Sequence, residues 1–201
     1  MKRIIFGLLI FFVNISAFAD EYVISKIECR DSEYFYNKSI SFKYDDEENV
    51  YYLFRSDYSS SYWFTLTPEK LEQLRNNLSK TKEWVDLANA NKTTISKELP
   101  DSEIKVEGTM KTGRNWYVTK KDIPLNFFFI SSFSEEAEFT SLTIVGGESE
   151  SKQNKYIDIE FENVVFINTA IDDFITAISK ETVDKAKEKH ANEKNASDLF
   201  N

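Results

Sequence analysis

The stretch that decides the fold is residues 34–66, which read YFYNKSISFKYDDEENVYYLFRSDYSSSYWFTL. In residues 34–44, apolar and aromatic side chains alternate with mostly polar ones, and this period of two predicts an antiparallel strand with one wet face. Residues 45–49 form a polar turn, and residues 50–55 are a return strand that is aromatic on both faces. A serine-rich turn then leads to a further strand at residues 62–66. Connections this short predict a meander of antiparallel strands.

The meander is followed by a helix start at Thr67, Pro68 and Glu69. A threonine can cap a helix, a proline fits its first position, and a glutamate meets the positive end of its dipole. Apolar residues then recur every three or four positions, which predicts an amphipathic helix that ends near residues 89–91. The stripe consists of Leu71, Leu74, Leu78, Val85 and Ala88, with Thr81 between them.

The second half of the chain repeats this order, strands first and then a helix. Strands are predicted, in chain order, at residues 103–107, 115–119, 125–133, 138–145 and 155–168. Gly146 and Gly147 begin a long polar hairpin loop. Thr169 with Asp172 fits a capping box, which predicts the start of the last helix. The apolar residues that mark this helix are Ile171, Phe174, Ile178 and Val183.

These elements predict an α+β fold, in which antiparallel sheet of meander strands packs against two amphipathic helices. We expect one domain over residues 20–190, because no linker rich in glycine, proline or serine divides it. Residues 20–91 and 103–190 are possible halves, each a strand meander followed by a helix. Residues 191–201 are predicted to be a flexible polar tail.

Residues 1–19 have the pattern of a cleaved secretory signal peptide. Lys2 and Arg3 precede an apolar run, and Ala17 and Ala19 occupy the small-residue positions of a cleavage site. The apolar run is shorter than a membrane span requires. The sequence therefore predicts an exported protein, periplasmic or secreted, with no transmembrane segment after removal of the signal.

The composition excludes several classes of protein. The chain has 201 residues and a net charge of −9, which argues against nucleic acid and anionic lipid as partners. Its one cysteine, Cys29, leaves no internal disulfide, so that Cys29 is either a half-buried strand residue or a site of pairing between chains. One histidine and one cysteine also exclude a zinc site of the usual kind.

The sequence lacks the common catalytic motifs. We find no nucleophile elbow, no zinc-protease helix, no phosphate-binding glycine loop and no dinucleotide fingerprint. The sole histidine, His190, is expected to be solvent-exposed near the end of the last helix. The sequence therefore leans away from an enzyme and indicates no cofactor.

Carboxylate side chains are the remaining candidates for a catalytic or metal-binding role. Asp158, Glu160 and Glu162 alternate with apolar residues, so they are expected to share one face of a strand. They could bind Ca²⁺ or act as an acid and base pair, although acids on one strand normally face water. Residues 45–48 are a second acidic cluster, expected to be a solvated turn. No metal site is predicted beyond these weak candidates.

Two groups of residues are candidates for binding. A basic and aromatic stretch stands out in this acidic chain, and an aromatic group flanks the serine-rich turn. Cationic and aromatic side chains suit contacts with a protein, a glycan or an acidic partner. A structural role, in charge pairing or in packing, is the alternative for both groups. The residues are Lys111, Arg114, Trp116 and Tyr117 in the first group, and Tyr58, Tyr62 and Trp63 in the second.

The favoured hypothesis is an exported, acidic, non-catalytic module that binds a protein or a glycan. One alternative is a carboxylate- or Ca²⁺-dependent hydrolase of the cell envelope. The other is a structural or assembly protein that forms oligomers through strand edges or through the apolar stripe of the first helix.

Overall fold

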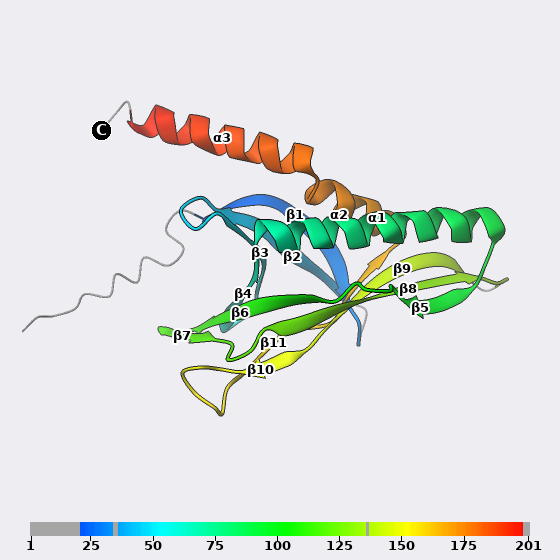
Figure 1. The fold of residues 1–201 in the computed structure, drawn as a ribbon, viewed down its shortest axis with the longest axis horizontal. Coiled ribbons are helices and arrows are strands. Elements are labelled where there is room, and N and C mark those ends of the chain that lie inside the picture. The colour runs from blue at the N-terminus through cyan, green and yellow to red at the C-terminus, as the bar shows by residue number, and fades with distance from the viewer. Residues whose placement is uncertain (1–20, 34–35, 136, 199–201) are drawn as a thin grey trace, which may run out of the picture.

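The computed structural model describes residues 21–33, 36–135 and 137–198. The predicted signal peptide at residues 1–19 lies outside the described residues. Figure 1 shows the helices α1 and α2 above most of the strands, with α3 extending away from them. The helices are α1 (Pro68–Asn91), α2 (Thr169–Ala177) and α3 (Lys180–Asp198).

The strands form one large antiparallel sheet and one small hairpin. The large sheet has ten strands in the order β5-β8-β9-β12-β1-β2-β3-β4-β6-β7. The first strands of the chain are β1 (Glu21–Asp31), β2 (Asn37–Asp45), β3 (Val50–Ser56), β4 (Ser60–Leu66), β5 (Ile95–Glu98) and β6 (Ile104–Thr112). They are followed by β7 (Asn115–Val118), β8 (Ile123–Phe133), β9 (Glu138–Gly146) and β12 (Val164–Ile167). The small hairpin consists of β10 (Glu148–Glu150) and β11 (Asp158–Glu160).

The large sheet closes on itself, which corrects the predicted fold class. β6 pairs with β8 as well as with β4, and Ile104 lies opposite Leu125 in this extra ladder. Eight strands therefore make a closed antiparallel barrel, accompanied in the described residues by three helices. The prediction of sheet packed against two helices was wrong. Alternation of polar and apolar residues indicates that a strand has two different faces, but it does not indicate which distant strand closes the barrel.

The meander itself is confirmed. β2, β3 and β4 are adjacent and antiparallel, and β1 pairs with β2. The acidic turn between β2 and β3 is organised by Asp45, whose Oδ1 accepts hydrogen bonds from the backbone N–H groups of Glu47 and Glu48, each at 3.0 Å. Asn49 then has a positive φ of 54°, a conformation that asparagine tolerates in turns. This acidic cluster is therefore a structured turn.

The helix α1 begins and ends as predicted. The Thr67 side chain accepts a hydrogen bond from the Lys70 backbone N–H at 3.3 Å, and Pro68 occupies the first turn. Leu71 and Leu78 are each 1% exposed and Val85 is 8% exposed. This stripe packs on β3, β4, β6, β8 and β9 of the same chain. It is therefore not available to join two copies of the protein, which removes helix-mediated oligomerisation.

The predicted last helix is two helices. The break lies between α2 and α3. There the Ser179 Oγ accepts a hydrogen bond from the Thr182 backbone N–H at 3.2 Å and so caps the start of α3. The N-cap of α2 is Asn168 rather than Thr169, and its Oδ1 accepts from the Thr140 backbone N–H at 2.8 Å instead of capping the helix. The predicted capping box was therefore wrong. The four apolar residues that marked the helix are all buried.

The strand predicted at residues 155–168 is also divided. It contains β11 and β12, separated by a link in which Phe161 packs into the core. Gly146 does not lie in an open loop but ends β9, opposite Leu125. A side chain at Gly146 would meet the Phe161 carbonyl oxygen, because a Cβ built there lies 2.3 Å from that atom. Glycine is needed here for close approach of two backbone segments.

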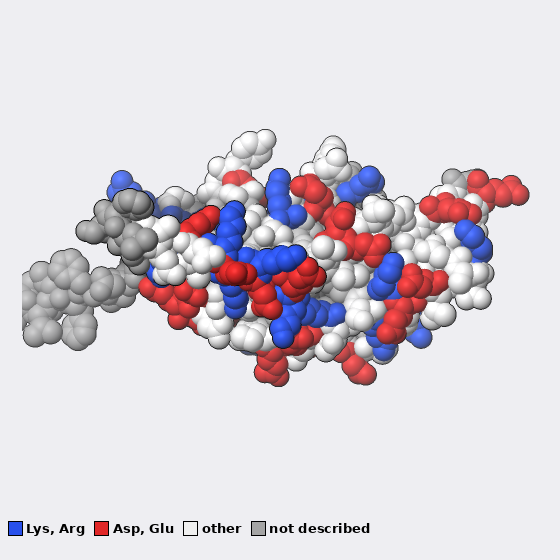
Figure 2. Space-filling view, turned by 90° about the horizontal axis from the view of Figure 1, so that it is seen from above, with Lys and Arg blue, Asp and Glu red and all other residues white. Residues whose placement is uncertain are grey.

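The helical face carries charges of both signs. Figure 2, which looks down on this face, shows acidic and basic side chains interspersed over it. Lys82 Nζ, for example, lies 3.4 Å from Asp86 of its own helix and 3.1 Å from Asp172 of α2. Exposed pairs of this kind add little to stability. None of the helices in the described residues is long and apolar enough to cross a membrane.

The helix α3 extends through residues 191–198, most of the segment predicted to be a flexible tail. Whether this end of the helix is flexible stays a prediction. His190 is half-buried rather than fully exposed as expected, because its ring stacks on Tyr22 of β1 with centroids 4.0 Å apart. Lys187, one turn earlier, places its Nζ 3.7 Å from the Tyr44 ring centroid. These contacts hold α3 against the strands.

Candidate functional site

Three aromatic side chains lie together on the outer side of the barrel. Trp63 on β4 is paired with Phe54 on β3, and their ring centroids are 5.0 Å apart. Trp116 on β7 lies 5.2 Å from Trp63. The alternating neighbours Leu53 and Phe64 belong to the core, so Phe54 and Trp63 point outward. We call Phe54, Trp63 and Trp116 the aromatic face. It joins the two groups of binding residues that the sequence predicted separately.

A shielded ion pair borders the aromatic face. Lys43 Nζ lies 2.7 Å from Glu21 Oε1 and 3.6 Å from the Phe54 ring centroid. The other carboxylate oxygen of Glu21 accepts a hydrogen bond from Trp63 Nε1 at 2.9 Å. The Lys43 and Glu21 side chains are only 12% and 13% exposed. This arrangement fixes the orientation of the Trp63 indole.

A row of outward residues crosses four strands beside the aromatic face. Ser56 on β3 pairs with Ser61 on β4, and their hydroxyl oxygens are 3.1 Å apart. Ser61 pairs in turn with Lys111 on β6. Lys111 pairs with Trp116 on β7 and places its Nζ 5.0 Å from the indole centroid. We call Ser56, Ser61, Lys111 and Trp116 the outer row. It brings two hydroxyls, a cation and an indole side by side.

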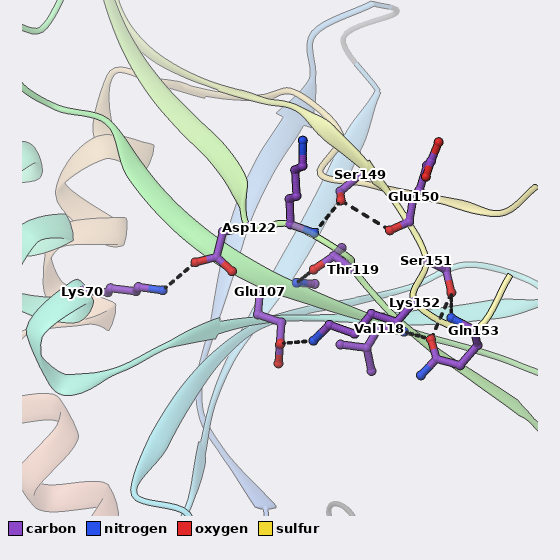
Figure 3. A network of polar contacts seen from close by, with 12 residues as sticks. Lys70, Glu107, Val118, Thr119, Asp122, Ser149, Glu150, Ser151, Lys152 and Gln153 are labelled. Carbon is purple, nitrogen blue, oxygen red and sulfur yellow. Dashed lines mark hydrogen bonds and ion pairs between the residues drawn. The ribbon is translucent and has the colours of Figure 1, made fainter. Parts of the chain in front are cut away.

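The strand that carries Trp116 is held in place by the segment after β10 (Figure 3). The Val118 backbone N–H donates to Gln153 Oε1 at 2.8 Å, and the Val118 carbonyl accepts from the Lys152 backbone N–H at 2.7 Å. Lys152 Nζ also lies 3.0 Å from the Glu107 carboxylate on β6. These bonds fix the end of β7, and so they position the indole at the end of the outer row.

Two of the predicted binding residues face the other way. Tyr62 pairs with Met110, and Met110 pairs with Tyr117. Met110 is a buried core residue, so Tyr62 and Tyr117 lie on the inner side of the sheet, partly buried. The Arg55 guanidinium stacks over the Tyr62 ring at 4.2 Å. Their sequence neighbours point outward because successive residues of a strand alternate between its faces.

The remaining predicted residues lie in turns. Tyr58 is fully exposed between β3 and β4, and Arg114 is exposed between β6 and β7. Within the described residues, neither Arg114 nor Lys111 has an ion-pair partner. Lys120, from the same basic stretch, is paired with Glu150 at 3.3 Å. Part of the basic stretch is therefore engaged within the chain, and part of it faces solvent.

The three candidate carboxylates do not gather. Asp158 and Glu160 are exposed on β11, whereas Glu162 lies in the link before β12. Glu162 binds Arg55 Nη1 at 2.5 Å and Lys38 Nζ at 2.8 Å. Burial disfavours the charged form of Glu162, but these two cations outweigh it and hold the pKa of the carboxyl below its usual range. In the part of the chain that the structure describes, no three acidic, histidine or cysteine side chains are arranged to hold a metal ion.

Cys29 gives a testable prediction about reactivity. Its side chain is 5% exposed, and burial, assisted by Glu28, raises the pKa of the thiol to about 12. At about pH 8 the thiolate is then only about one part in ten thousand. We expect iodoacetamide to leave Cys29 unmodified in the native protein and to modify it fully in urea, as mass spectrometry would show. Because the folded protein favours the protonated thiol, Cys29 contributes to the free energy of unfolding in full below about pH 9. This contribution is lost as the pH rises towards 12. Rapid alkylation of the folded protein would contradict this environment.

Sequence reasoning missed several members of the site. Glu21, Lys43 and Phe54 frame Trp63, and Ser56 and Ser61 complete the outer row. The only signal for Glu21, Lys43 and Phe54 was their position in strands of alternating pattern. Ser56 and Ser61 had no signal, because the sequence placed them in a turn. Comparison of the chain with models of protein families, with curated proteins and with solved structures finds no match. The site therefore has to be interpreted from its own geometry.

Proposed function

We propose that the protein is an exported, non-catalytic binding protein for a glycan, and that the outer row contacts the sugar. The supporting observation is the sequence of paired groups from Ser56 to Trp116, with their hydroxyls, ammonium and indole on one side of the sheet. An indole offers an apolar surface on which a sugar ring can pack. Hydroxyl and ammonium groups beside it can exchange hydrogen bonds with sugar hydroxyls.

The size of the exposed aromatic surface favours a glycan over a protein as the partner. A stable protein interface buries about 800 Å² on each partner. Trp63 is only 5% exposed, and Trp116 is half-buried, so the aromatic face offers little area to a large partner. None of the exposed large apolar side chains in the described residues belongs to the aromatic face: they are Val23, Tyr36, Tyr58, Leu87, Ile95 and Tyr156. A ligand much smaller than a protein therefore suits this surface better.

The charge of the chain narrows the class of glycan. A net charge of −9 opposes the approach of a polyanion, although Lys111 and Arg114 are cationic. Beyond about 10 Å, salt screens these two charges, so they act on groups in direct contact with them. We therefore favour a neutral glycan, bound by packing and hydrogen bonds.

Export is part of the proposal and is supported by the sequence alone. The pattern of residues 1–19 is that of a secretory signal. The chain has one cysteine and therefore holds no internal disulfide. Glycans of a cell envelope or an extracellular matrix would then be accessible to the protein. The carboxylate hydrolase and assembly through strand edges stay predictions, because no contact within the described residues favours either.

Binding to an array of soluble chito-, cello- and manno-oligosaccharides tests the proposal. We expect the protein to bind a subset of these sugars, and Trp116→Ala to weaken the binding at least about fivefold, since stacking on an aromatic side chain contributes about 1 kcal/mol or more. Lys111→Ala should weaken it by a smaller factor. Tyr156→Ala is the matched control, because Tyr156 is 82% exposed and also lies under a lysine, Lys155, at 5.0 Å. The absence of any binding, or equal losses in Trp116→Ala and Tyr156→Ala, would contradict the proposal.

A further inference from the structure

A second candidate site lies at one end of the barrel, on the inner side of the strands. A cavity of about 520 Å³ opens there between β1, β2, β3 and the segment before β12. Its volume falls within the range of small-molecule pockets, about 300–1,000 Å³. Part of its wall is apolar, formed by Cys29, Ile40 and Val164. The other part is charged. We call this cavity the mouth pocket.

The charged wall of the mouth pocket is rich in hydrogen-bond donors. Arg55 and Lys38 both contact the Glu162 carboxylate, at 2.5 and 2.8 Å. Asp57 is the other acid in the wall, at 3.9 Å from Arg55 Nη1 and 45% exposed. The Arg55 side chain is only 15% exposed, and its Nε is buried without a hydrogen-bond partner among the described residues. A buried donor of this kind is costly to leave unpaired.

Glu162 shows which chemical group this wall accepts. It presents one carboxylate, whose two oxygens bind the two cations separately. Glu162 is 36% exposed and belongs to the link between β11 and β12, outside the barrel strands, so its carboxylate lies at the accessible side of the pocket. A carboxylate from a ligand could replace it against the same donors. The apolar wall would then receive the remainder of the ligand.

We propose that the mouth pocket binds a small organic acid, a carboxylate attached to a short apolar body, and that Glu162 competes with it for Arg55 and Lys38. Ser56 of the outer row also borders the mouth pocket, but Arg55, Lys38 and Glu162 do not belong to the outer row. The inference therefore does not depend on glycan binding. Removing the charge of Glu162 should therefore strengthen binding, whereas removing the charge of Lys38 should weaken it. Opposite effects from the two partners of one ion pair are not expected of a merely structural contact.

Calorimetric titration with hexanoate tests this proposal. Glu162→Gln should tighten hexanoate binding about tenfold, and Lys38→Gln should weaken it about tenfold, since each change adds or removes one charge-assisted hydrogen bond to the ligand and a tenfold change is about 1.4 kcal/mol. Lys38→Gln is preferred to a change at Arg55, because Lys38 is 43% exposed and its loss should not unfold the protein. Glu160→Gln, an exposed acid on β11, is the control and should leave the affinity unchanged.

Hexanol serves as the neutral probe of the same length. The proposal requires hexanol to bind at least about tenfold more weakly than hexanoate. Three results would overturn it: no hexanoate binding by either the unaltered protein or Glu162→Gln, hexanol binding as tight as hexanoate, or weaker hexanoate binding by Glu162→Gln. Circular dichroism of each variant establishes that the fold is retained. The glycan array is run on the same variants, so that loss of one activity is distinguished from loss of the other.

Discussion

Replacing Gly146 by alanine is expected to lower the free energy of unfolding by about 3 kcal/mol, at the upper end of the usual cost of overpacking. The added Cβ would lie 2.3 Å from the carbonyl oxygen of Phe161 and 2.5 Å from its Cβ. The first of these atoms belongs to the backbone, so it cannot move aside by a change of rotamer. The Phe161 ring packs edge-on against Phe64 in the barrel core, with centroids 4.8 Å apart. Displacing Phe161 would therefore disturb the core.

Urea denaturation followed by circular dichroism measures this loss. Gly113 provides the comparison, because a Cβ there meets nothing within 4 Å, although its φ is +59°. Gly113→Asn should change the stability little, since asparagine tolerates this conformation. If Gly146→Ala were as stable as the unaltered protein, the close contact between the end of β9 and the link before β12 would be wrong.

Neutralising Glu21 is expected to have the second large effect, a loss of about 3 kcal/mol in the free energy of unfolding. Glu21→Gln keeps an oxygen that can accept the Trp63 hydrogen bond but leaves the charge of Lys43 without its counterion. Both side chains are largely shielded, at 12% and 13% exposed, so water compensates only in part. Phe54, whose ring centroid lies 3.6 Å from Lys43 Nζ, gives further but incomplete compensation.

A double-mutant cycle isolates this charge pair. Lys43→Met removes the second charge, so the double variant of Glu21→Gln with Lys43→Met should recover much of the stability that Glu21→Gln loses. The exposed pair of Glu103 and Lys105, with side chains 49% and 64% exposed, is the matched control. Glu103→Gln should cost less than about 0.5 kcal/mol. If Glu21→Gln and Glu103→Gln lowered the free energy of unfolding equally, the Glu21–Lys43 pair would be solvated and the prediction would be contradicted.

The local elements could be predicted from the sequence, whereas the closure of the barrel could not. The capping threonine and the apolar stripe of α1 are local signals, and the alternation in β2 is local too. The ladder between β6 and β8 depends on three pairs, among them Val106 with Ile123, that resemble any other apolar pairing. The prediction of a single strand at residues 155–168 failed for the same reason. The break between β11 and β12 follows from contacts of Phe161 with residues distant in the sequence.

The candidate site, too, could be predicted only in part from the sequence. Lys111 and Trp116 were predicted as binding residues because they stand out in composition, and the structure pairs them directly. Trp63 was assigned to a separate group, since only the ladders of β4 with β6 and of β6 with β7 bring it to 5.2 Å from Trp116. Ser56 and Ser61 carry no signal in the sequence. A hydroxyl becomes notable only when its neighbours across the strands are known.

The central claim, that a glycan binds beside the aromatic face, can be tested through tryptophan fluorescence. The chain has three tryptophans, and the third, Trp84, lies on α1 against Phe129, with centroids 5.8 Å apart. In a Trp84→Phe variant, only Trp63 and Trp116 emit. Titration of this variant with the chito-, cello- and manno-oligosaccharides is predicted to shift or quench the emission saturably for each sugar that the array shows to bind. An unchanged emission at saturating concentrations of a sugar that binds the variant would place the glycan elsewhere and contradict the account.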